Sequence, residues 1–170
     1  PQLFEKEKKG LELLSKSTFV VPNPIKTGSI DDTQFLIMDY IEQGTTLNWS
    51  IFGLKLAQLH LIEGKYFGLD HNNYIGSIEQ INQECGAWSE FYTNHRLIVL
   101  TAKARDQGLF EKKHCDWVEK LCQRLDELIP TCKPSLIHGD LWSGNLLNHA
   151  SGHPVLIDPA VYYGHPEMDW

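Results

Sequence analysis

Apolar residues recur with the spacing of an α-helix in four segments of the chain. In the first segment, Phe4, Leu11 and Leu14 fall on one side, with good helix formers between them. In the second, Asn48 is placed to cap the N-terminus. In the last, the apolar residues follow the i, i+3, i+4, i+7 rule until Pro130 ends the run. The pattern predicts helices over residues 4–17, 48–62, 86–104 and 115–129.

Short apolar runs between these segments predict β-strands. The stretch "TQFLIMDYI" (33–41) is short and rich in apolar and aromatic residues, which is typical of a buried strand. Prolines exclude helix from the preceding residues, which close in a turn at "DD". Towards the C-terminal end, "LIH", "LLN" and "VLID" indicate small strands, the last two joined by a Ser-Gly turn. The glycine- and asparagine-containing segment 64–77 is interpreted as an ordered loop with aromatic anchors.

Composition and charge favour a globular protein with a small-molecule partner. The chain has 170 residues, of which 42% are hydrophobic, so it can bury a sizeable core. The formal net charge is -7 and no cluster of four Lys or Arg occurs, which argues against a nucleic acid or an anionic membrane as partner. No apolar run approaches the roughly 20 residues that span a bilayer, and no signal-peptide pattern is present, so we expect a cytoplasmic protein. The cysteine spacing indicates reduced thiols.

The stretch "LIHGDLWSGN" (136–145) carries the most informative chemistry. Asp140 and Asn145 form a D-x-x-x-x-N pattern, and Asp158 ends the next apolar run. Phosphoryl transfer from ATP needs a carboxylate near the attacking hydroxyl and oxygen ligands for Mg²⁺, and these residues supply both. Taken alone, D-x-x-x-x-N is common in loops. The preceding His-Gly, the apolar runs on each side and the second aspartate favour one site.

Neighbouring histidines and glycines have simpler interpretations. We expect His138 to be a buried histidine that braces the loop by hydrogen bonds, in preference to a chemical role. The other histidines nearby lack the spacing of metal ligands, so a metal-dependent hydrolase is disfavoured. Gly139 and Gly144 are expected to relieve crowding of the backbone around the loop.

Four stretches together resemble one family. They are "LIHGDLWSGNLL", "PVLIDPAVYYGHPEMDW", "FGLDHNNYIGS" and "FLIMDYIEQG", and they resemble the fructosamine 3-kinase (ketosamine kinase) family, a branch of the aminoglycoside-phosphotransferase-like, protein-kinase-like fold. The resemblance runs over nearly the whole chain. It implies an α+β, two-lobe fold that is only partly represented. Residues 1–42 would be a remnant of the small lobe with its first helix, strands and hinge. Residues 43–170 would be part of a mostly helical large lobe, with a small β-hairpin carrying the catalytic loop.

The resemblance also implies roles for single residues. Asp140 looks like the catalytic base that orients the substrate hydroxyl, and Asn145 and Asp158 look like the magnesium ligands. Trp142 either packs under the loop or offers a flat apolar face to a sugar chain, and the resemblance favours contact with the substrate.

The ATP site implied by the resemblance lies at the hinge. The backbone of Asp39, Tyr40 and Ile41 would meet the adenine edge, and Met38 would be the gatekeeper. Glu7 matches the glutamate that pairs with the ATP-binding lysine, although a solvated helix face is a serious alternative for it.

The implied activity is an ATP- and Mg²⁺-dependent phosphorylation of ketosamines, such as small or protein-bound fructosamine and ribulosamine adducts, at O3. Two alternatives stay open. One is a kinase of the same fold with another acceptor, such as an aminoglycoside or a choline-like compound, whose charges call for an acidic or aromatic lining. The other is a non-catalytic nucleotide-binding fragment. Protein-kinase activity is disfavoured, because the short interval from Asp158 to "GHPE" leaves little room for a long activation loop.

The chain departs from the family at both ends. Kinases of this fold carry a glycine-rich loop and the ATP-binding lysine before the first helix, yet only six residues precede Glu7. The sequence begins with Pro1, and its only methionines are Met38 and Met168. We therefore expect the chain to be a piece of a longer protein. We also expect this piece to phosphorylate nothing by itself.

Overall fold

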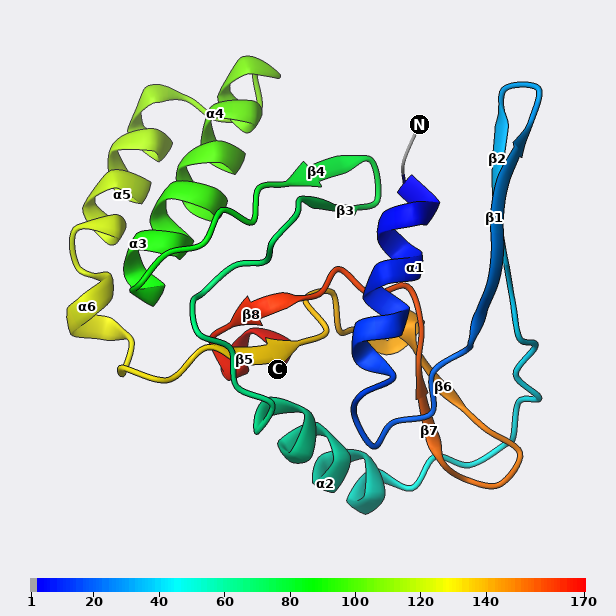
Figure 1. Ribbon diagram of the computed structural model, residues 1–170. Coiled ribbons are helices and arrows are strands. Elements are labelled where there is room, and N and C mark those ends of the chain that lie inside the picture. Colours follow the sequence, from blue (N-terminus) through cyan, green and yellow to red (C-terminus); the bar gives the residue numbers. More distant parts are fainter. Residues whose placement is uncertain (1–2) are drawn as a thin grey trace.

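Helix α1 (Leu3–Leu14) and the hairpin of β1 (Pro24–Ile30) and β2 (Thr33–Met38) form the N-terminal part of the computed structural model, which describes residues 3–170 (Figure 1). The two strands are antiparallel. Asp31 begins the turn between them with a φ of 51°, in the left-handed region that aspartate tolerates better than most residues. The helix predicted over 4–17 is confirmed.

Strand β2 is shorter and more exposed than the sequence predicts. Residues 39–41 continue past Met38 without strand pairing. In the two-stranded sheet one face stays open to solvent, and Ile37 is 48% exposed. The expectation of a buried strand over 33–41 is therefore wrong, because apolar content alone does not reveal how many layers cover a strand.

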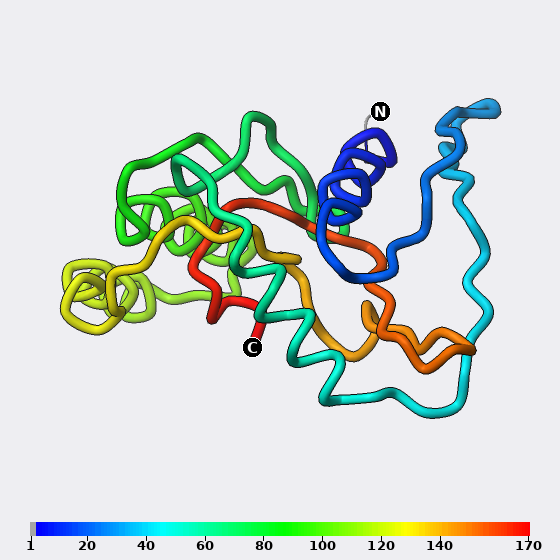
Figure 2. Tube along the Cα trace, turned by 60° about the horizontal axis from the view of Figure 1, so that its bottom comes forward, coloured from blue at the N-terminus to red at the C-terminus, as the bar shows by residue number. Residues whose placement is uncertain are grey.

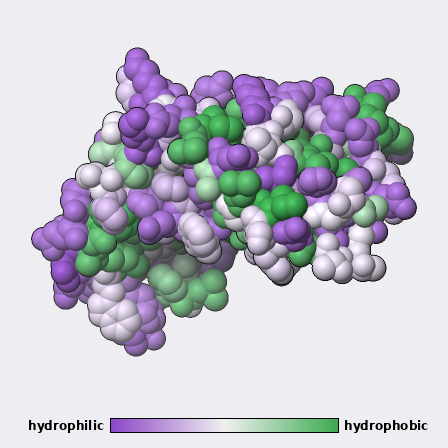
Figure 3. Space-filling view, turned by 90° about the horizontal axis from the view of Figure 1, so that it is seen from below, coloured by the Kyte–Doolittle hydropathy of each residue, from purple (hydrophilic) through white to green (hydrophobic). Residues whose placement is uncertain are grey.

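Helix α2 (Trp49–His60) confirms the second predicted helix and its cap. The Asn48 side chain accepts a hydrogen bond from the Ile51 N–H. The helix buries Leu56 and Leu59 on the side that faces the core. Figure 3 shows the opposite side, where apolar side chains gather among polar ones. The exposed apolar residues on and just after this helix are Trp49, Leu54 and Leu61.

The long segment after α2 contains a short hairpin. Strands β3 (Asn73–Ile75) and β4 (Ile78–Gln80) pair within and just after the segment that was interpreted as a loop. Phe67 is a buried aromatic anchor of this segment, as predicted. The next helix runs from Trp88 to Asp106, and it confirms the prediction over 86–104 with one irregularity. It comprises α3 (Trp88–Tyr92), the π-helical turn η1 (Thr93–Leu97) and α4 (Ile98–Asp106).

The helix predicted over 115–129 is divided in the structure. Helix α5 (Lys112–Cys122) begins earlier, because the His114 ring accepts a hydrogen bond from the Glu111 N–H and caps its first turn. The backbone leaves helical geometry at Arg124, and the short α6 (Leu125–Leu128) follows. The prediction of one continuous helix is wrong. No residue between Lys112 and Cys122 is buried, so core packing does not hold the apolar stripe in one line.

The C-terminal part contains two antiparallel strand pairs and confirms the predicted small strands. Strand β5 pairs with β8, and β6 pairs with β7 across a turn that contains Gly152. In Figure 2 the red part of this segment runs between α1 and α2, and the orange hairpin of β6 and β7 extends to one side of the molecule. The elements are β5 (Ser135–Ile137), η2 (Ser143–Asn145), β6 (Leu146–Asn148), β7 (Pro154–Leu156), β8 (Tyr162–Gly164) and η3 (Pro166–Asp169).

The core surrounds strand β5. All three of its residues are buried, and Leu136 and Ile137 belong to an apolar cluster whose members come from the whole length of the chain. Among these are Leu14, Leu59, Phe91 and Val161. The four cysteines are free thiols, as predicted. Over residues 3–170, no helix has the length and apolarity required to cross a membrane.

Candidate active site

Strand β5 leads directly into the loop of His138, Gly139 and Asp140. Gly139 has a φ of +80°, and a Cβ there would lie 2.2 Å from the Ala160 carbonyl oxygen, so only glycine fits. On the same side, the Ala160 N–H donates a hydrogen bond of 3.0 Å to the His138 carbonyl. The loop therefore lies against the segment that follows Asp158. The predicted role of Gly139 in relieving crowding is confirmed.

His138 braces this loop from inside, as predicted. Its ring is fully buried, with Nε2 3.0 Å from the Ile157 carbonyl oxygen, and Nδ1 accepts the Asp140 N–H at 3.3 Å. Burial lowers the pKa of His138, against the opposing effect of the carboxylates around it, of which Asp169 acts most strongly. A neutral ring that donates through Nε2 and accepts through Nδ1 satisfies both contacts.

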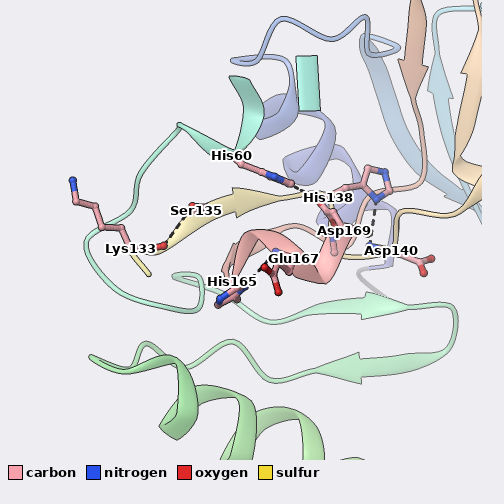
Figure 4. Close-up of polar contacts among 9 residues, drawn as sticks. His60, Lys133, Ser135, His138, Asp140, His165, Glu167 and Asp169 are labelled. Carbon is pink, nitrogen blue, oxygen red and sulfur yellow. Dashed lines mark hydrogen bonds and ion pairs between the residues drawn. The ribbon is translucent and has the colours of Figure 1, made fainter. Parts of the chain in front are cut away.

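Asp169 holds the same loop from the other side, and sequence reasoning did not identify it. Its carboxylate accepts the His138 N–H at 2.8 Å and the Gly139 N–H at 2.9 Å. One of its oxygens also lies 3.0 Å from Nε2 of His60, at the end of α2 (Figure 4). Asp169 is 4% exposed. Nothing in the spacing of the sequence links it to the loop, because the contact depends on how β8 and η3 fold back.

Asn145 joins the two aspartates that the sequence singled out. Its Nδ2 donates to the Asp140 carbonyl at 2.8 Å, to Oδ2 of Asp140 at 3.2 Å and to the Asp158 carbonyl at 3.4 Å. All three bonds use the amide nitrogen, which leaves Oδ1 as an acceptor for another partner. The Asp140 carboxylate points away from the Asp169 side chain (Figure 4). The structure thus brings Asp140, Asn145 and Asp158 together.

These oxygen donors suit a hard cation. Mg²⁺ prefers oxygen ligands and usually takes one or two from the protein, the rest coming from phosphates and water. The Asp158 carboxylate and Oδ1 of Asn145 are ligands of this kind. Within residues 3–170, no group of three or more His, Cys, Asp or Glu side chains is arranged to hold a metal. The donor set fits an ion that a nucleotide helps to coordinate.

Asp158 and Glu7 place two carboxyl groups near each other. Asp158 has a φ of 51°, a strained conformation that is often found at functional sites. The pKa of Glu7 is raised to about 7, first by burial and then by the charge of Asp158. Helix α1 approaches this closely because Gly10 faces Pro159, where a Cβ would lie 3.1 Å from the proline ring. A cation between the two carboxyl groups would relieve their repulsion.

The residues predicted to form the hinge line a cavity of about 260 Å³ that also reaches Glu7 and Asp158. The Asp39 N–H is occupied, since it donates to the Asn23 carbonyl at 3.1 Å. Within residues 3–170, neither the Asp39 carbonyl nor the Ile41 N–H takes part in a backbone hydrogen bond, so both can meet a planar ligand edge. Leu147 and Ile157 add apolar walls. The sequence-predicted residues gathered at this cavity are Glu7, Met38, Asp39, Tyr40, Ile41 and Asp158.

Trp142 lies on the surface two residues beyond Asp140. Its side chain is 61% exposed and folds over Gly144, where a Cβ would lie 2.3 Å from the indole. The alternative of a core tryptophan packed under the loop is therefore wrong. The backbone crowding expected at Gly144 is not found, because the atoms that a Cβ there would meet belong to the indole of Trp142.

Comparisons with known proteins agree in the family they identify. The family model for fructosamine kinase matches residues 1–170. A curated protein assigned as a ketoamine kinase in Lactiplantibacillus plantarum is 40% identical, over 98% of this chain and 59% of the relative. The chloroplastic protein-ribulosamine 3-kinase of Arabidopsis thaliana is 37% identical, over 100% of this chain and 54% of the relative. The chain therefore spans a little over half the length of these relatives.

Solved structures support the same conclusion. A protein assigned as a fructosamine-3-kinase in Haemophilus somnus has a TM-score of 0.89 at 28% identity, covering 99% of this chain and 57% of that one. Another from Thermobifida fusca has a TM-score of 0.84 at 34% identity, covering 99% and 58%. The mixed helices and strands described above thus form an α+β, kinase-like fold.

Proposed function

Because this chain belongs to the fructosamine kinase family, we propose that the protein containing it transfers the γ-phosphoryl group of ATP to O3 of free or protein-bound ketosamines. The relatives named ketoamine kinase and protein-ribulosamine 3-kinase support the substrate class and the position. One observation carries the proposal: Asn145 hydrogen-bonds to both Asp140 and Asp158. This gathers the Asp140 carboxylate and two oxygen ligands at one place, as phosphoryl transfer requires.

Asp140 is the proposed catalytic base. Its carboxylate is only half-buried and points away from the Asp169 side chain. It can therefore accept a hydrogen bond from the substrate hydroxyl and then take up the proton of that hydroxyl. The Asp140 backbone is held at both of its polar groups. The Asp140 N–H donates to Nδ1 of His138, and the Asp140 carbonyl accepts from Nδ2 of Asn145. This support keeps the base in one orientation while the hydroxyl attacks.

The remaining residues hold the nucleotide and its metal. Asn145, through Oδ1, and Asp158 are the proposed ligands of Mg²⁺, which when bound neutralises charge on the phosphates. The Asp39 carbonyl and Ile41 N–H would face the adenine edge, with Met38 beside it and Tyr40 contributing backbone only, since its side chain is 89% exposed. Glu7 would pair with the ATP-binding lysine.

We also propose the lobe boundary that the resemblance implies. Residues 1–42 would belong to the small lobe and residues 43–170 to the large lobe. The hinge cavity supports this division, because α1 and β2 line one side of it, and residues of β6 and the Asp158 segment line another.

The test uses the full-length protein with fructosyl-lysine and ribulosyl-lysine, and with kanamycin and choline as competing acceptors. We expect Mg²⁺-dependent ATP consumption with the ketosamines alone, and NMR should place the phosphate on O3. Activity with kanamycin or choline but not with ketosamines would contradict the substrate while leaving a kinase. ATP binding without turnover on any acceptor would favour the non-catalytic alternative.

Two variants test the assigned residues. Asp140→Ala should lower kcat by about 10²-fold or more, as expected for loss of a general base. Asp158→Ala should instead weaken Mg-ATP binding, measured by titration calorimetry. The matched control is Asp116→Ala, on the exposed surface of α5. Near-normal turnover of Asp140→Ala would remove the assignment of the base.

A further inference from the structure

Arg96 is a buried cation in the segment between α2 and β5, on the irregular turn η1. It is 6% exposed, and no carboxylate within residues 3–170 forms an ion pair with it. The turn is π-helical, because the Ile98 N–H bonds to the Thr93 carbonyl five residues back. Such turns are rare and frequently occur at functional sites. A buried guanidinium at such a turn is costly unless its hydrogen bonds are well used.

The guanidinium begins a chain of three hydrogen bonds that ends at the Val161 carbonyl, three residues after Asp158. Its Nη2 donates to Oδ1 of Asn82 at 2.7 Å, Nδ2 of Asn82 donates to Oδ1 of Asn73 at 2.8 Å, and Nδ2 of Asn73 donates to the Val161 carbonyl at 2.8 Å. Arginine can only donate, so it fixes the orientation of both amides along this chain. All three side chains are buried.

Arg96 also contacts the same segment directly. Its guanidinium carbon lies 4.3 Å from the centre of the Tyr162 ring and 4.7 Å from that of Phe91. The two rings stack on each other with centroids 5.4 Å apart. A planar guanidinium stacks on aromatic faces and directs several hydrogen bonds at once, which lysine does not. Arg96 therefore holds the segment 158–162 through one backbone carbonyl and one side chain.

The opposite side of this segment touches the catalytic loop. Ala160 donates its N–H to the His138 carbonyl, and its carbonyl packs against Gly139. Gln80 of β4 reaches the same Ala160 carbonyl, at 3.4 Å. The residues directly after Asp158 are thus clamped between the loop that carries Asp140 and the polar chain that starts at Arg96.

We propose that Arg96 is a positioning residue that fixes the Asp158 segment against the catalytic loop through Asn82, Asn73 and Tyr162. This inference rests on the proposed function for its kinetic consequence, although the clamp itself is a property of the protein without ligands. Through it, the segment between α2 and β5 determines how accurately Asp158, the proposed metal ligand, faces Asp140.

Two variants separate positioning from folding. Arg96→Lys keeps the charge but removes the planar contacts. Asn82→Asp is nearly isosteric and gives Arg96 a carboxylate partner, so it retains a stabilising contact at Arg96, yet it cannot donate to Asn73. The control is Arg105→Lys, on α4 of the same long helix, where the side chain is 61% exposed. The variants are made in the full-length protein.

The first measurement is amide hydrogen exchange without nucleotide or ketosamine. We expect a selective loss of protection of at least ~10-fold at the Ala160 N–H in both variants, relative to the β6–β7 amides. The second measurement is kinetic: kcat should fall ~10-fold or more and the Mg²⁺ concentration for half-maximal activity should rise, with the KM for ketosamine little changed. The control should match the wild type in both.

Each outcome decides the inference. Wild-type protection at Ala160 in Asn82→Asp would overturn it, and so would an equal loss of protection throughout the chain in Arg96→Lys. If one variant does not fold, the other decides. If the wild type phosphorylates no ketosamine, the proposed function fails, while the exchange data still show whether the clamp exists.

Discussion

Trp142 presents an indole two residues after the proposed base. A neutral sugar chain offers few charges for recognition, so a flat apolar face of this kind can contribute to its binding. Its 61% exposed side chain rests on Gly144, so the ring is supported and one face stays accessible. We expect Trp142→Ala to raise the KM for ketosamine by about 10-fold, in line with loss of one stacking contact, and to leave the KM for ATP little changed. Steady-state kinetics of the full-length protein measure both constants.

Trp117 provides the control for this experiment. It lies on α5 and is 60% exposed, so Trp117→Ala removes the same side chain from a similar environment away from the loop. If both variants change the KM for ketosamine equally, the stacking role of Trp142 is wrong.

Glu7 makes stability depend on pH. Its pKa is raised to about 7 from an ordinary value of 4.5, so between these values the folded chain binds more protons than the unfolded chain. The contribution of Glu7 to the free energy of unfolding should be fully present below pH 4.5, and it should be lost as pH rises through 7. We expect Glu7→Gln to remove this part of the decline, measured by urea unfolding of the chain at pH 5 and pH 8.

The control for Glu7 is Glu12→Gln on the same helix, where the carboxylate is 54% exposed. A wild-type pH dependence in Glu7→Gln would show that the carboxyl group is not perturbed. Solvent reaches part of Glu7, so the effect should be smaller than for a fully buried acid.

At this scale the sequence reveals the polar residues whose function requires a fixed local pattern. Asp140 and Asn145 are five positions apart, and Asp158 ends a strand, so the structure gathers all three at one place, although their roles stay predictions. Asp169 contacts His138 from 31 residues away, because the chain folds back. Arg96 acts on the segment after Asp158 through Asn82 and Asn73. No local spacing marks contacts of that kind.

Helix α2, strand β5 and the turn η3 are tied together by a single carboxylate. Asp169 accepts the N–H groups of His138 and Gly139 and approaches His60 at the end of α2. Asp169→Asn keeps the shape but removes the charge. We expect it to lower the free energy of unfolding by about 2 kcal/mol, as for hydrogen bonds to a charged group, and to lower kcat as the loop loosens.

Urea unfolding and steady-state kinetics on the same preparation test this prediction. Asp126→Asn, on the exposed side of α6, is the matched control and should change neither quantity. Unchanged kcat in Asp169→Asn despite lower stability would limit Asp169 to a role in folding.

The ends of a helix were predictable where its apolar stripe faces the core, and less so elsewhere. The stripes of α1 and α2 each bury two leucines, and those helices were predicted nearly to their ends. Helix α5 buries none of its residues, so its stripe did not determine where the helix stops. The β3–β4 hairpin was missed because its three-residue strands are held mainly by buried amides such as Asn73, which local apolar patterns do not register.

The cavity at residues 38–41 exists only in the folded chain. Its lining comes from α1, from the end of β2 and from β6 with the Asp158 segment, which lie far apart in sequence. The resemblance implied roles at the nucleotide site for Glu7, for residues 38–41 and for Asp158, but it implied none for β6. Their convergence depends on α1 packing against Pro159 and on the antiparallel pairing of β6 with β7.

The charge of the assembled site leads to the last prediction. Glu7, Asp140 and Asp158 are acidic, the formal net charge is -7, and within residues 3–170 no lysine or arginine forms an ion pair with any of these three groups. Triphosphate binding requires positive charge, from a lysine and from the N–H groups of a glycine-rich loop, in addition to Mg²⁺. We therefore expect the 170-residue chain alone to show no saturable Mg-ATP binding by calorimetry at concentrations that saturate the full-length protein, and no turnover of ketosamines. Circular dichroism should first establish that this chain is folded. Robust ATP turnover by the folded chain would show that residues 1–170 contain a complete phosphate site, and the role proposed for Glu7 would then have to be reassigned.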